Sequence, residues 1–312
     1  MIIKNHHKIF VAGHKGLVGS SLIKNLKIRG YKNIITIDKK KVDLRNQKET
    51  INFLKKKKPK FVFIAAAKVG GIYANNVFRG EFIYDNLSIQ NNLIHGSYLA
   101  GVKKIIFLGS SCIYPKYAKQ PIKEDYLLSG FLEKTNEPYA VAKIAGIKLC
   151  EAYNDQYKTE FKCIMPCNIF GPGDNYHEQN SHFLPALIRK IHDIKLGKKK
   201  NLNLWGSGKV KREFLFVDDL SDACIYFMNK KTNSSLINIG TGKDYTIKEI
   251  AKIALNVLNV NCKIIFDNRK IDGTPRKLLD ISLAKNLGWV SKTSLENGII
   301  KTYNDYVSTY SF

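Results

Sequence analysis

The stretch Val11-Ala12-Gly13-His14-Lys15-Gly16-Leu17-Val18-Gly19 connects the apolar run Lys8–Ala12 to an amphipathic run over Leu17–Arg29. Its glycines follow the spacing G-x-x-G-x-x-G. Glycines at such a junction allow a tight turn, a close approach of the backbone to a pyrophosphate, and packing of the helix on the strand. The free N–H groups at the start of the helix then face the anion. The stretch therefore predicts a dinucleotide-binding turn rather than a plain loop.

The first half of the chain repeats this alternation of apolar and amphipathic runs. The expected strands are Lys8–Ala12, Asn33–Ile37, Phe61–Ala65, Lys103–Gly109 and Phe161–Pro166. The expected helices are Leu17–Arg29, Gln47–Lys57, Glu81–Ala100 and Tyr139–Tyr157. Continuous apolar strands separated by helices indicate a parallel sheet that is covered on both faces. We therefore expect an α/β fold with a Rossmann-type, doubly wound parallel sheet.

The pattern changes after Gly171-Pro172-Gly173, where loops rich in Gly, Asn and His surround shorter elements. These elements lie near His182–Ile194, Phe214–Asn229, Ile247–Leu258 and Lys263–Phe266. Loops commonly supply binding groups, so this half is expected to form a smaller α/β substrate-binding domain. We expect a dinucleotide-binding domain over residues 1–171, completed by a segment near 213–240. Residues 172–212 and 241–312 would then form the substrate-binding domain.

The composition excludes several classes of protein. The 312 residues carry a formal net charge of +25 at pH 7, but the cations are 44 Lys and only 7 Arg. Arg is the residue suited to bidentate reading of phosphates and bases, so we expect no nucleic-acid partner. No window reaches the ~18 apolar residues of a membrane span, and no secretory signal is apparent, so we expect no membrane partner and a cytoplasmic location.

The cysteines do not predict a metal site or a disulfide scaffold. Six cysteines in a chain of this length are too few for such a scaffold. Three residues separate Cys163 from Cys167, but no second Cys or His pair follows at the spacing of a zinc site. We therefore expect no bound metal.

The choice between NAD and NADP stays open at the end of the second expected strand. An acidic residue at this position binds a ribose 2′-hydroxyl, whereas cations accommodate the 2′-phosphate of NADP. The sequence supplies Asp38 and then Lys39-Lys40-Lys41. Together with Lys15, the lysine run favours NADP(H).

Two further segments predict acid–base chemistry. The fourth expected strand leads into Gly109-Ser110-Ser111-Cys112, and a helix near Pro138 carries Tyr139 and Lys143. Residues four apart on a helix share a face, so Lys143 is expected to lower the pKa of Tyr139 from ~10 toward neutrality. A Tyr-x-x-x-Lys pair alone is usually a surface pair. The glycine turn and the serine-bearing strand favour a catalytic pair here.

These motifs, with several others, carry a resemblance that spans essentially the whole chain. They are Ala12-Gly-His-Lys-Gly-Leu-Val-Gly19, Ala65-Ala-Ala-Lys-Val-Gly-Gly-Ile72, Leu108-Gly-Ser-Ser-Cys-Ile-Tyr-Pro115, Thr135-Asn-Glu-Pro-Tyr-Ala-Val-Ala-Lys143, Asn180-Ser-His182, Trp205-Gly-Ser-Gly208, Arg212-Glu-Phe214 and Asp272-Gly-Thr-Pro-Arg-Lys-Leu-Leu-Asp280. The sequence resembles the GDP-L-fucose synthase family of the extended short-chain dehydrogenase/reductases. The contexts of Cys112 and His182 are specific to this family within the superfamily.

The resemblance implies a substrate, a cofactor and residue roles. The substrate would be GDP-4-keto-6-deoxy-D-mannose, with epimerisation at C3 and C5 by Cys112 and His182. Reduction of the C4 ketone by NADPH would use Ser110, Tyr139 and Lys143, and a homodimer is implied. The implied cofactor-binding residues are Gly13, His14, Lys15, Gly16, Leu17, Val18, Gly19, Lys143, Pro166, Cys167, Asn168, Ile169 and His182. The implied substrate-binding residues are Lys190, Trp205, Arg212, Asp272 and Lys277.

The implied chemistry suits these residue types. The C3 and C5 protons flank a ketone, so a base on one face and an acid on the other invert each centre through an enolate. A thiol whose pKa is lowered near Lys143 suits the base, and an imidazole suits the acid. Ser111 could share the role of Ser110. Many members carry Arg where this chain has Lys190, and some carry Arg where it has Asp38.

The alternatives are another extended short-chain nucleotide-sugar epimerase or reductase, and a non-catalytic binding protein on the same scaffold. A 4,6-dehydratase would have an acidic pair where this chain has Cys112-Ile-Tyr114. A simple 4-epimerase needs no Cys/His pair. The complete Ser110, Tyr139 and Lys143 set argues against a non-catalytic protein.

Overall fold

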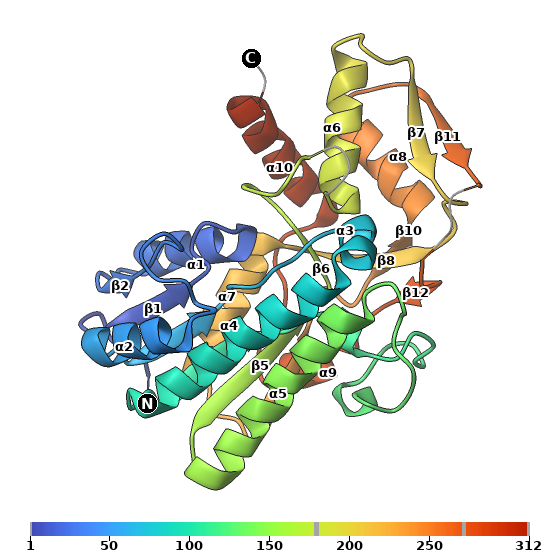
Figure 1. Ribbon diagram of the computed structural model, residues 1–312. Coiled ribbons are helices and arrows are strands. Elements are labelled where there is room, and N and C mark those ends of the chain that lie inside the picture. The colour runs from blue at the N-terminus through green and yellow to red at the C-terminus, as the bar shows by residue number, and fades with distance from the viewer. Residues whose placement is uncertain (1, 178–180, 270–272, 311–312) are drawn as a thin grey trace.

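The computed structural model describes residues 2–177, 181–269 and 273–310 (Figure 1). Its largest sheet has six parallel strands in the order β2-β1-β3-β4-β5-β9. These are β1 (Ile9–Ala12), β2 (Ile34–Ile35), β3 (Phe61–Ile64), β4 (Lys104–Leu108), β5 (Glu160–Pro166) and β9 (Leu236–Ile239). The chain runs outward from β1 to β2 and then returns to β3 on the other side of β1. In such doubly wound sheets, ligands bind at the carboxyl ends of the strands where the order reverses.

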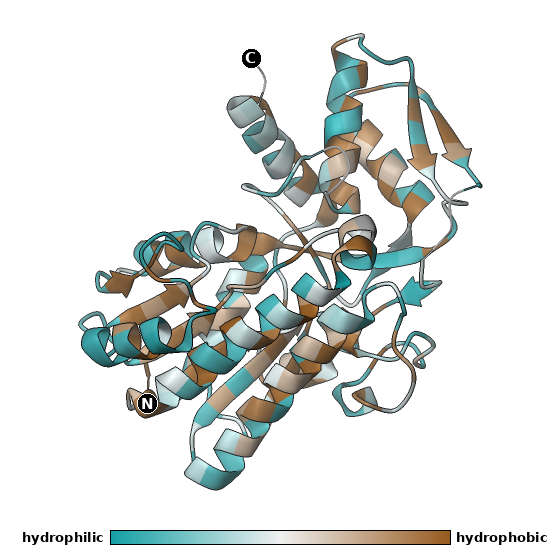
Figure 2. Ribbon diagram, in the orientation of Figure 1, coloured by the Kyte–Doolittle hydropathy of each residue, from teal (hydrophilic) through white to brown (hydrophobic). Residues whose placement is uncertain are grey.

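Helices cover both faces of this sheet. One layer contains α2, α4 and α5, and the other contains α1 packed against α7 (Figure 1). Their bounds are α1 (Leu17–Ile28), α2 (Gln47–Lys57), α4 (Arg79–Leu99), α5 (Glu137–Tyr157) and α7 (Val217–Asn229). The central strands are apolar on both sides, as Figure 2 shows, because each side packs against a helix layer. The Rossmann-type α/β sheet predicted from the sequence is confirmed.

A second part of the chain, at the top right of Figure 1, contains smaller sheets and helices. Strand β8 pairs with β6 and β12 in parallel and with β10 in antiparallel, while β7 pairs with β11 in parallel. The strands are β6 (Asn168–Phe170), β7 (Asn201–Trp205), β8 (Lys211–Phe216), β10 (Asp244–Thr246), β11 (Lys263–Asp267) and β12 (Arg276–Lys277). The remaining α-helices are α3 (Ile72–Val77), α6 (Phe183–Lys195), α8 (Ile247–Val257), α9 (Ser282–Asn286) and α10 (Leu295–Tyr310).

Local sequence explains where several helices begin and end. The Asn46 side chain accepts a hydrogen bond from the Glu49 backbone at the start of α2. Thr246 and Glu249 form a reciprocal capping box at the start of α8. Lys58 adopts a left-handed conformation after α2, and Pro59 follows it. The lysines at the end of α2 thus lie at the negative end of the helix dipole.

The buried apolar side chains form two clusters. The first cluster surrounds the large sheet and includes Leu215 and Leu220. The second packs α6, α8 and α10 around Phe170 and Phe216. The segment from Leu279 to Trp289 belongs to the first cluster. From the sequence, residues 241–312 were expected to lie wholly in the substrate-binding domain. The Leu279–Trp289 segment instead packs against the large sheet, because Leu279 pairs with Ile122 and α9 packs on β9.

Among residues 2–177, 181–269 and 273–310, no helix combines the length and the apolar character needed to cross a membrane. Within those same ranges, no group of three or more His, Cys, Asp or Glu side chains lies together in an arrangement that could hold a metal ion.

Candidate active site

The backbone segments of the turn after β1 pack too closely to leave room for a side chain at Gly13 or Gly19. Gly13 has a φ of +84°, and a Cβ atom there would lie 2.6 Å from the Ala66 nitrogen. A Cβ atom at Gly19 would lie 2.0 Å from the Gly13 carbonyl oxygen. Gly16 is the N-cap of α1 and supplies no capping side chain. The first N–H groups of α1 therefore face this turn without a side-chain cap, which fits the pyrophosphate of a dinucleotide.

A salt bridge joins this turn to the end of the β2 segment. Lys15 Nζ lies 2.5 Å from Asp38 Oδ1, and His14 Nε2 lies 3.6 Å from the same oxygen. The Lys15 hydrogen bond holds the pKa of Asp38 below its ordinary value. The carboxylate is therefore partly neutralised at the position where ribose is bound in dinucleotide folds.

Three catalytic candidates lie together beyond β4. The Ser110 side chain lies close enough to the side chains of both Tyr139 and Cys112 to interact with them, and its Oγ accepts a hydrogen bond from the Cys112 backbone N–H at 3.5 Å. Ser110 is the N-cap of a short 3-10 helix, Ser111–Ile113, and this helix places the Cys112 side chain in the interior, 6% exposed. Ser111 is also buried, but Ser110 is the serine in contact with Tyr139.

Lys143 lies one turn after Tyr139 on α5, as the spacing predicted, and is only 3% exposed. Its Nζ donates a hydrogen bond to the Leu108 carbonyl oxygen at 2.8 Å. It lies 4.7 Å from the centre of the Phe107 ring and 5.8 Å from that of the Tyr139 ring. Burial lowers the pKa of Lys143 to about 8.

The lowered pKa values expected for the tyrosine and the cysteine are wrong in direction. Burial raises the pKa of Tyr139 well above its usual value of 10.0. Burial also raises the pKa of Cys112 above 9.0, although Lys277 and Lys143 favour the thiolate. The sequence gives the identity of the neighbouring cations but not the loss of hydration, and that loss is the larger effect here.

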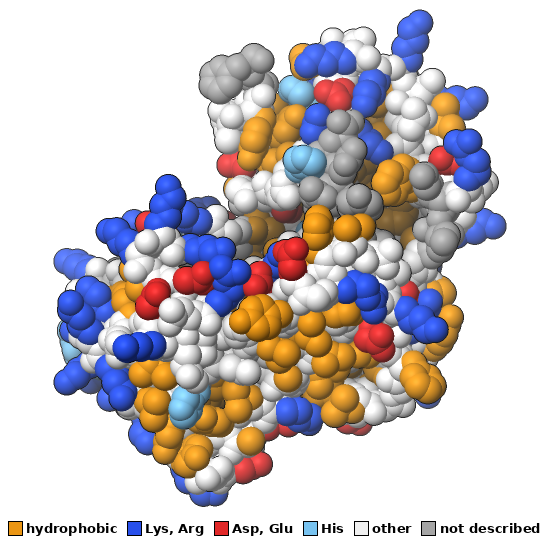
Figure 3. Space-filling view, viewed as in Figure 1, with side chains coloured by type: hydrophobic (Ala, Val, Ile, Leu, Met, Phe, Trp, Pro, Cys, Tyr) orange, Lys and Arg blue, Asp and Glu red, His pale blue; other side chains and the backbone are white. Residues whose placement is uncertain are grey.

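His182 lies in the other part of the molecule, at the N-cap of α6. This end of α6 faces the large sheet domain (Figure 1), and the surface is hollowed between the two parts (Figure 3). The His182 side chain is exposed to solvent, yet the surrounding protein lowers the pKa of its ring from 6.5. The neutral imidazole is therefore the dominant form at pH 7.

The predicted cofactor-binding segment after β5 lies at the carboxyl edge of the same sheet. Pro166 ends β5, and Asn168 and Ile169 begin β6. Asn168 Nδ2 donates to the Glu213 carbonyl oxygen at 2.8 Å, and the Cys167 backbone N–H donates to Ile239. This segment, the glycine turn and Ser110 thus all follow the carboxyl ends of parallel strands.

The predicted substrate residues lie on the smaller sheets and on α6. Lys190 Nζ donates to the Asn203 carbonyl oxygen at 2.8 Å. Trp205 ends β7 with 68% of its surface exposed. Arg212 on β8 is paired in register with Lys277 on β12. Asp272 lies outside the described residues.

Two features of the site could not be assigned from the sequence. Lys277 is close enough to Cys112 to favour its thiolate, so it lies near the reacting groups as well as beside Arg212. Glu213, the next residue after Arg212, is fully buried. The signal available for Glu213 was a lone acidic residue at the start of the apolar run Phe214-Leu215-Phe216.

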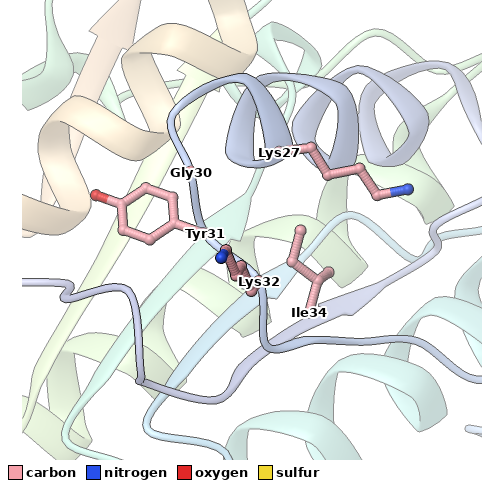
Figure 4. Close-up of a pocket in the computed structure, with 5 residues that line it drawn as sticks. All are labelled: Lys27, Gly30, Tyr31, Lys32 and Ile34. Carbon is pink, nitrogen blue, oxygen red and sulfur yellow. The ribbon is translucent and has the colours of Figure 1, made fainter.

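A surface pocket lies away from these residues, at the far end of α1 (Figure 4). It is lined by Lys27, Gly30, Tyr31, Lys32 and Ile34. These residues precede or begin β2, so the pocket lies at the amino edge of the sheet. None of the predicted site residues lines it.

Comparisons with known proteins agree with this geometry. Residues 9–240 match the NAD dependent epimerase/dehydratase family. The chain is 49% identical over 308 residues to a GDP-L-fucose synthase of Sinorhizobium fredii, covering 99% of this chain and 98% of the relative.

Solved structures show the same similarity. A GDP-6-OMe-4-keto-L-xylo-heptose reductase from C. jejuni superimposes with a TM-score of 0.93 at 38% identity, covering 99% of each chain. An NADP-bound GDP-L-fucose synthetase from Naegleria fowleri gives a TM-score of 0.91 at 28% identity, covering 99% of this chain and 95% of that one. From its turn, its sheet and these matches, the chain belongs to the NAD dependent epimerase/dehydratase family.

Proposed function

We propose that this protein converts GDP-4-keto-6-deoxy-D-mannose to GDP-L-fucose by epimerisation at C3 and C5 followed by NADPH-dependent reduction at C4. The observation that carries the proposal is the contact of one side chain, Ser110, with both Tyr139 and Cys112. A ketone oxygen held by Ser110 and Tyr139 would have the thiol beside it. The similarity to a GDP-L-fucose synthase over nearly the whole chain supports the substrate.

In the epimerisation, Cys112 removes a proton next to the ketone and His182 returns one from the opposite face. The negative charge that develops on the C4 oxygen is stabilised by hydrogen bonds from Ser110 and Tyr139. Lys277 and Lys143 are the cations that favour the Cys112 thiolate. Once the Cys112 thiol has released its proton to solvent and the His182 imidazole has taken one up, a second round at the other carbon uses the same groups, because both carbons flank the same carbonyl.

In the reduction, Tyr139 gives its proton to the C4 oxygen, and Lys143 compensates the charge left on the phenolate. NADPH, when bound, supplies a hydride to C4. The glycine turn would hold its pyrophosphate, and Lys15 with Lys39–Lys41 would face the 2′-phosphate. The remaining cofactor contacts are assigned to residues 166–169 at the end of β5.

The nucleotide sugar is assigned to the smaller sheets. Arg212 and Lys277 lie side by side in register and would face the diphosphate. Lys190 would add charge from α6, and the exposed Trp205 offers a flat surface for the base. Asp272 belongs to the same proposed set.

A second candidate is a reductase that acts at C4 of another GDP-sugar without epimerisation. The similarity to the C. jejuni reductase, at a TM-score of 0.93, favours this candidate. The two functions differ in whether Cys112 and His182 exchange protons with solvent.

The experiment that tests the proposal uses GDP-4-keto-6-deoxy-D-mannose and NADPH in deuterated water, with oxidation of NADPH and deuterium at C3 and C5 followed together. We expect both signals from the wild-type protein. Cys112→Ser should lose deuterium entry by about 100-fold or more. Tyr139→Phe should lose NADPH oxidation while it retains measurable exchange.

Other results of this experiment would distinguish the two candidate functions or refute them. NADPH oxidation without deuterium at C3 and C5 would favour the simple reductase. No oxidation with NADPH or NADH would refute both candidates. Normal epimerisation by Cys112→Ser would refute the assignment of the base.

We further propose that the protein forms a homodimer through α4 and α5. Figure 3 shows hydrophobic side chains gathered over the face where Figure 1 places these helices. Tyr84, Leu99 and Val141 on this pair are 67%, 42% and 41% exposed. Apolar surface of this kind favours association. Sedimentation of the wild-type protein and of Tyr84→Glu tests the proposal, since the variant should sediment as a monomer.

A cytoplasmic location is also proposed. All six cysteines are free thiols in the structure, which fits a reducing compartment. Fractionation of the cells that make the protein, with immunodetection in each fraction, tests this location.

A further inference from the structure

Glu213 is a fully buried carboxylate inside strand β8. Its neighbours in sequence are Arg212, assigned to the substrate, and Phe214, which belongs to the second apolar cluster. Burial raises the pKa of this carboxyl above its usual value. Burying a carboxylate is unfavourable unless hydrogen bonds compensate the lost hydration. An apolar side chain would fill a strand position at less cost, so the carboxylate calls for an explanation.

The hydrogen bonds of Glu213 join segments that are far apart in the chain. Oε1 accepts from the Thr241 N–H at 2.6 Å and from the Gly242 N–H at 2.7 Å. Oε2 accepts from the Leu279 N–H at 3.0 Å. The partners are thus mostly backbone donors, from the turn that follows β9 and from the segment that follows β12.

The turn after β9 is shaped for this contact. A Cβ atom at Gly240 would lie 2.2 Å from Glu213 Oε1. The Thr241 hydroxyl adds a further contact to Oε1 at 3.4 Å. This side chain therefore joins β8 to the turn that follows β9, the edge strand of the large sheet.

The contact between Glu213 Oε2 and the Leu279 N–H affects the proposed substrate site. Leu279 follows Lys277 by two residues, and Lys277 is paired in register with Arg212. The same segment is held from its other side, where the Ile122 N–H donates to the Leu278 carbonyl oxygen at 2.8 Å. The position of Lys277 relative to Arg212 and Cys112 thus depends on a segment anchored by Glu213.

We propose that Glu213 is a positioning residue for the nucleotide-sugar site, where it holds β12 against β8 and so keeps Lys277 beside Arg212 and close to Cys112. It contacts the segment that carries Lys277 rather than the substrate. The inference rests on the proposed function, because Arg212 and Lys277 are assigned to the diphosphate of a GDP-sugar.

The first variant is Glu213→Gln. The amide retains one acceptor oxygen, but its NH₂ group must face a backbone N–H on either the Thr241 side or the Leu279 side. One set of contacts is therefore lost. We expect the dissociation constant for GDP, measured by calorimetry, to rise about tenfold. NADPH affinity should change less than about twofold, because the glycine turn follows β1 and Asn168 contacts the backbone carbonyl of Glu213, which the substitution leaves in place.

Asp219→Asn is the matched control. Asp219 is also a buried carboxylate, 6% exposed, that accepts backbone hydrogen bonds from distant residues. Its Oδ2 accepts from Thr293 at 2.8 Å and from Lys292 at 3.2 Å. This variant should lower the melting temperature without changing the affinity for GDP. It therefore separates a loss of stability from a loss of positioning.

A second variant, Glu213→Asp, retains the charge and shortens the side chain by one methylene. It serves the same measurement if Glu213→Gln does not fold. It should also weaken GDP binding, because the shorter side chain cannot reach both the Thr241 turn and Leu279.

The outcomes are separable. Wild-type affinity for GDP in a folded Glu213 variant would overturn the inference and leave the proposed function standing. An equal loss of GDP affinity in Asp219→Asn, or an equal loss of NADPH affinity in Glu213→Gln, would show a general structural role and also overturn it. Absence of GDP binding by the wild-type protein would overturn the proposed function and this inference with it.

Discussion

The Lys143 side chain donates its hydrogen bond to the carbonyl oxygen of Leu108, at 2.8 Å, although Tyr139 lies one helical turn away. The ammonium group is thus held at the end of β4 by a neutral acceptor in an interior where it is 3% exposed. Burial of a charge without a counter-charge disfavours the protonated form. The lysine is therefore a destabilising element of the fold.

This burial predicts a dependence of stability on pH. The pKa of Lys143 is about 8 in the folded protein, against 10.5 ordinarily. Between these values the unfolded chain binds more protons, so the free energy of unfolding rises with pH, by about 3 kcal/mol in all for this group. Lys143→Met should remove that rise and abolish reduction. Urea denaturation from pH 7.5 to 10 measures it.

Lys162 provides the control for this prediction. It is also buried, 4% exposed, with a pKa lowered to about 8, and it donates to the Phe227 carbonyl oxygen at 2.8 Å away from the site. Lys162→Met should flatten the pH dependence similarly while activity is retained. An unchanged pH slope in Lys143→Met would contradict the prediction.

The pKa directions at Cys112 and His182 predict an unusual pH profile for epimerisation. The active form needs a thiolate and an imidazolium, but burial raises the pKa of Cys112 and lowers that of His182. Between the two pKa values the proton resides mainly on the Cys112 thiol, and the His182 imidazole is neutral. Transfer of this proton from the thiol to the imidazole takes up no proton from solvent. The small fraction of the active form is therefore independent of pH in this range. We expect a broad plateau in the rate of deuterium entry.

His182→Asn should change the shape of that profile. Without the imidazole, only the thiolate fraction limits proton removal, so the residual rate should rise roughly tenfold per pH unit from pH 6 to 9. The measurement is deuterium entry at C3 and C5 in buffered D₂O. A residual rate that stays flat over this range would show that Cys112 is not the titrating base.

The salt bridge between Lys15 and Asp38 predicts how the cofactor is chosen. Asp38→Asn removes a negative charge from beside the 2′-phosphate position, so NADPH should bind more tightly and NADH more weakly, since its ribose loses a carboxylate partner. Lys15→Met should weaken NADPH by about tenfold and affect NADH less. Fluorescence titration of each cofactor without substrate gives the affinities.

Lys24, on the helix α1 that follows the glycine turn, is the matched control. It forms an ion pair with Asp218, at 2.9 Å, away from the glycine turn. Lys24→Met should leave both cofactor affinities unchanged. Equal effects of the Lys15 and Lys24 substitutions would indicate a general electrostatic effect of the protein's positive charge.

The glycine turn predicts different outcomes for two alanine substitutions. A Cβ atom at Gly19 would overlap the Gly13 carbonyl oxygen at 2.0 Å, so Gly19→Ala should destabilise the protein without cofactor by roughly 1–3 kcal/mol. The nearest atom to a Cβ at Gly16 is 3.5 Å away, so Gly16→Ala should fold normally and weaken NADPH binding, because its methyl group meets the pyrophosphate. Melting temperatures and NADPH titrations separate the two. Equal melting temperatures would contradict the prediction.

Sequence patterns were sufficient to predict the helices and strands with strong hydrophobic periodicity. They were insufficient to predict the bounds of the short strands. The apolar runs at Phe61 and Phe161 correspond to β3 and β5, and the predicted helix over Gln47–Lys57 is α2. The second strand was expected over Asn33–Ile37, but β2 comprises only Ile34–Ile35. Strand β12 has two residues, and its partners are set by contacts with β8 rather than by any local pattern.

For the site, spacing predicted the helical pair Tyr139 and Lys143, the resemblance implied the other residues, and neither predicted the electrostatics. The i, i+4 spacing of Tyr139 and Lys143 correctly placed both on α5. The expected lowering of the Tyr139 and Cys112 pKa values failed because dehydration depends on packing by residues remote in sequence. Glu213 acquires its importance only when the turn after β9 and the segment after β12 meet it.

Strand β8 alternates its side chains between the two apolar clusters, with Leu215 in the first and Phe214 and Phe216 in the second. Unfolding of either cluster removes β8, and with it the β8 side chains that pack in the other cluster. The two parts of the molecule should therefore unfold in one cooperative transition. A fragment that ends before β8, such as residues 1–171, would lack the side chains that complete its interior and should not persist as a folded species.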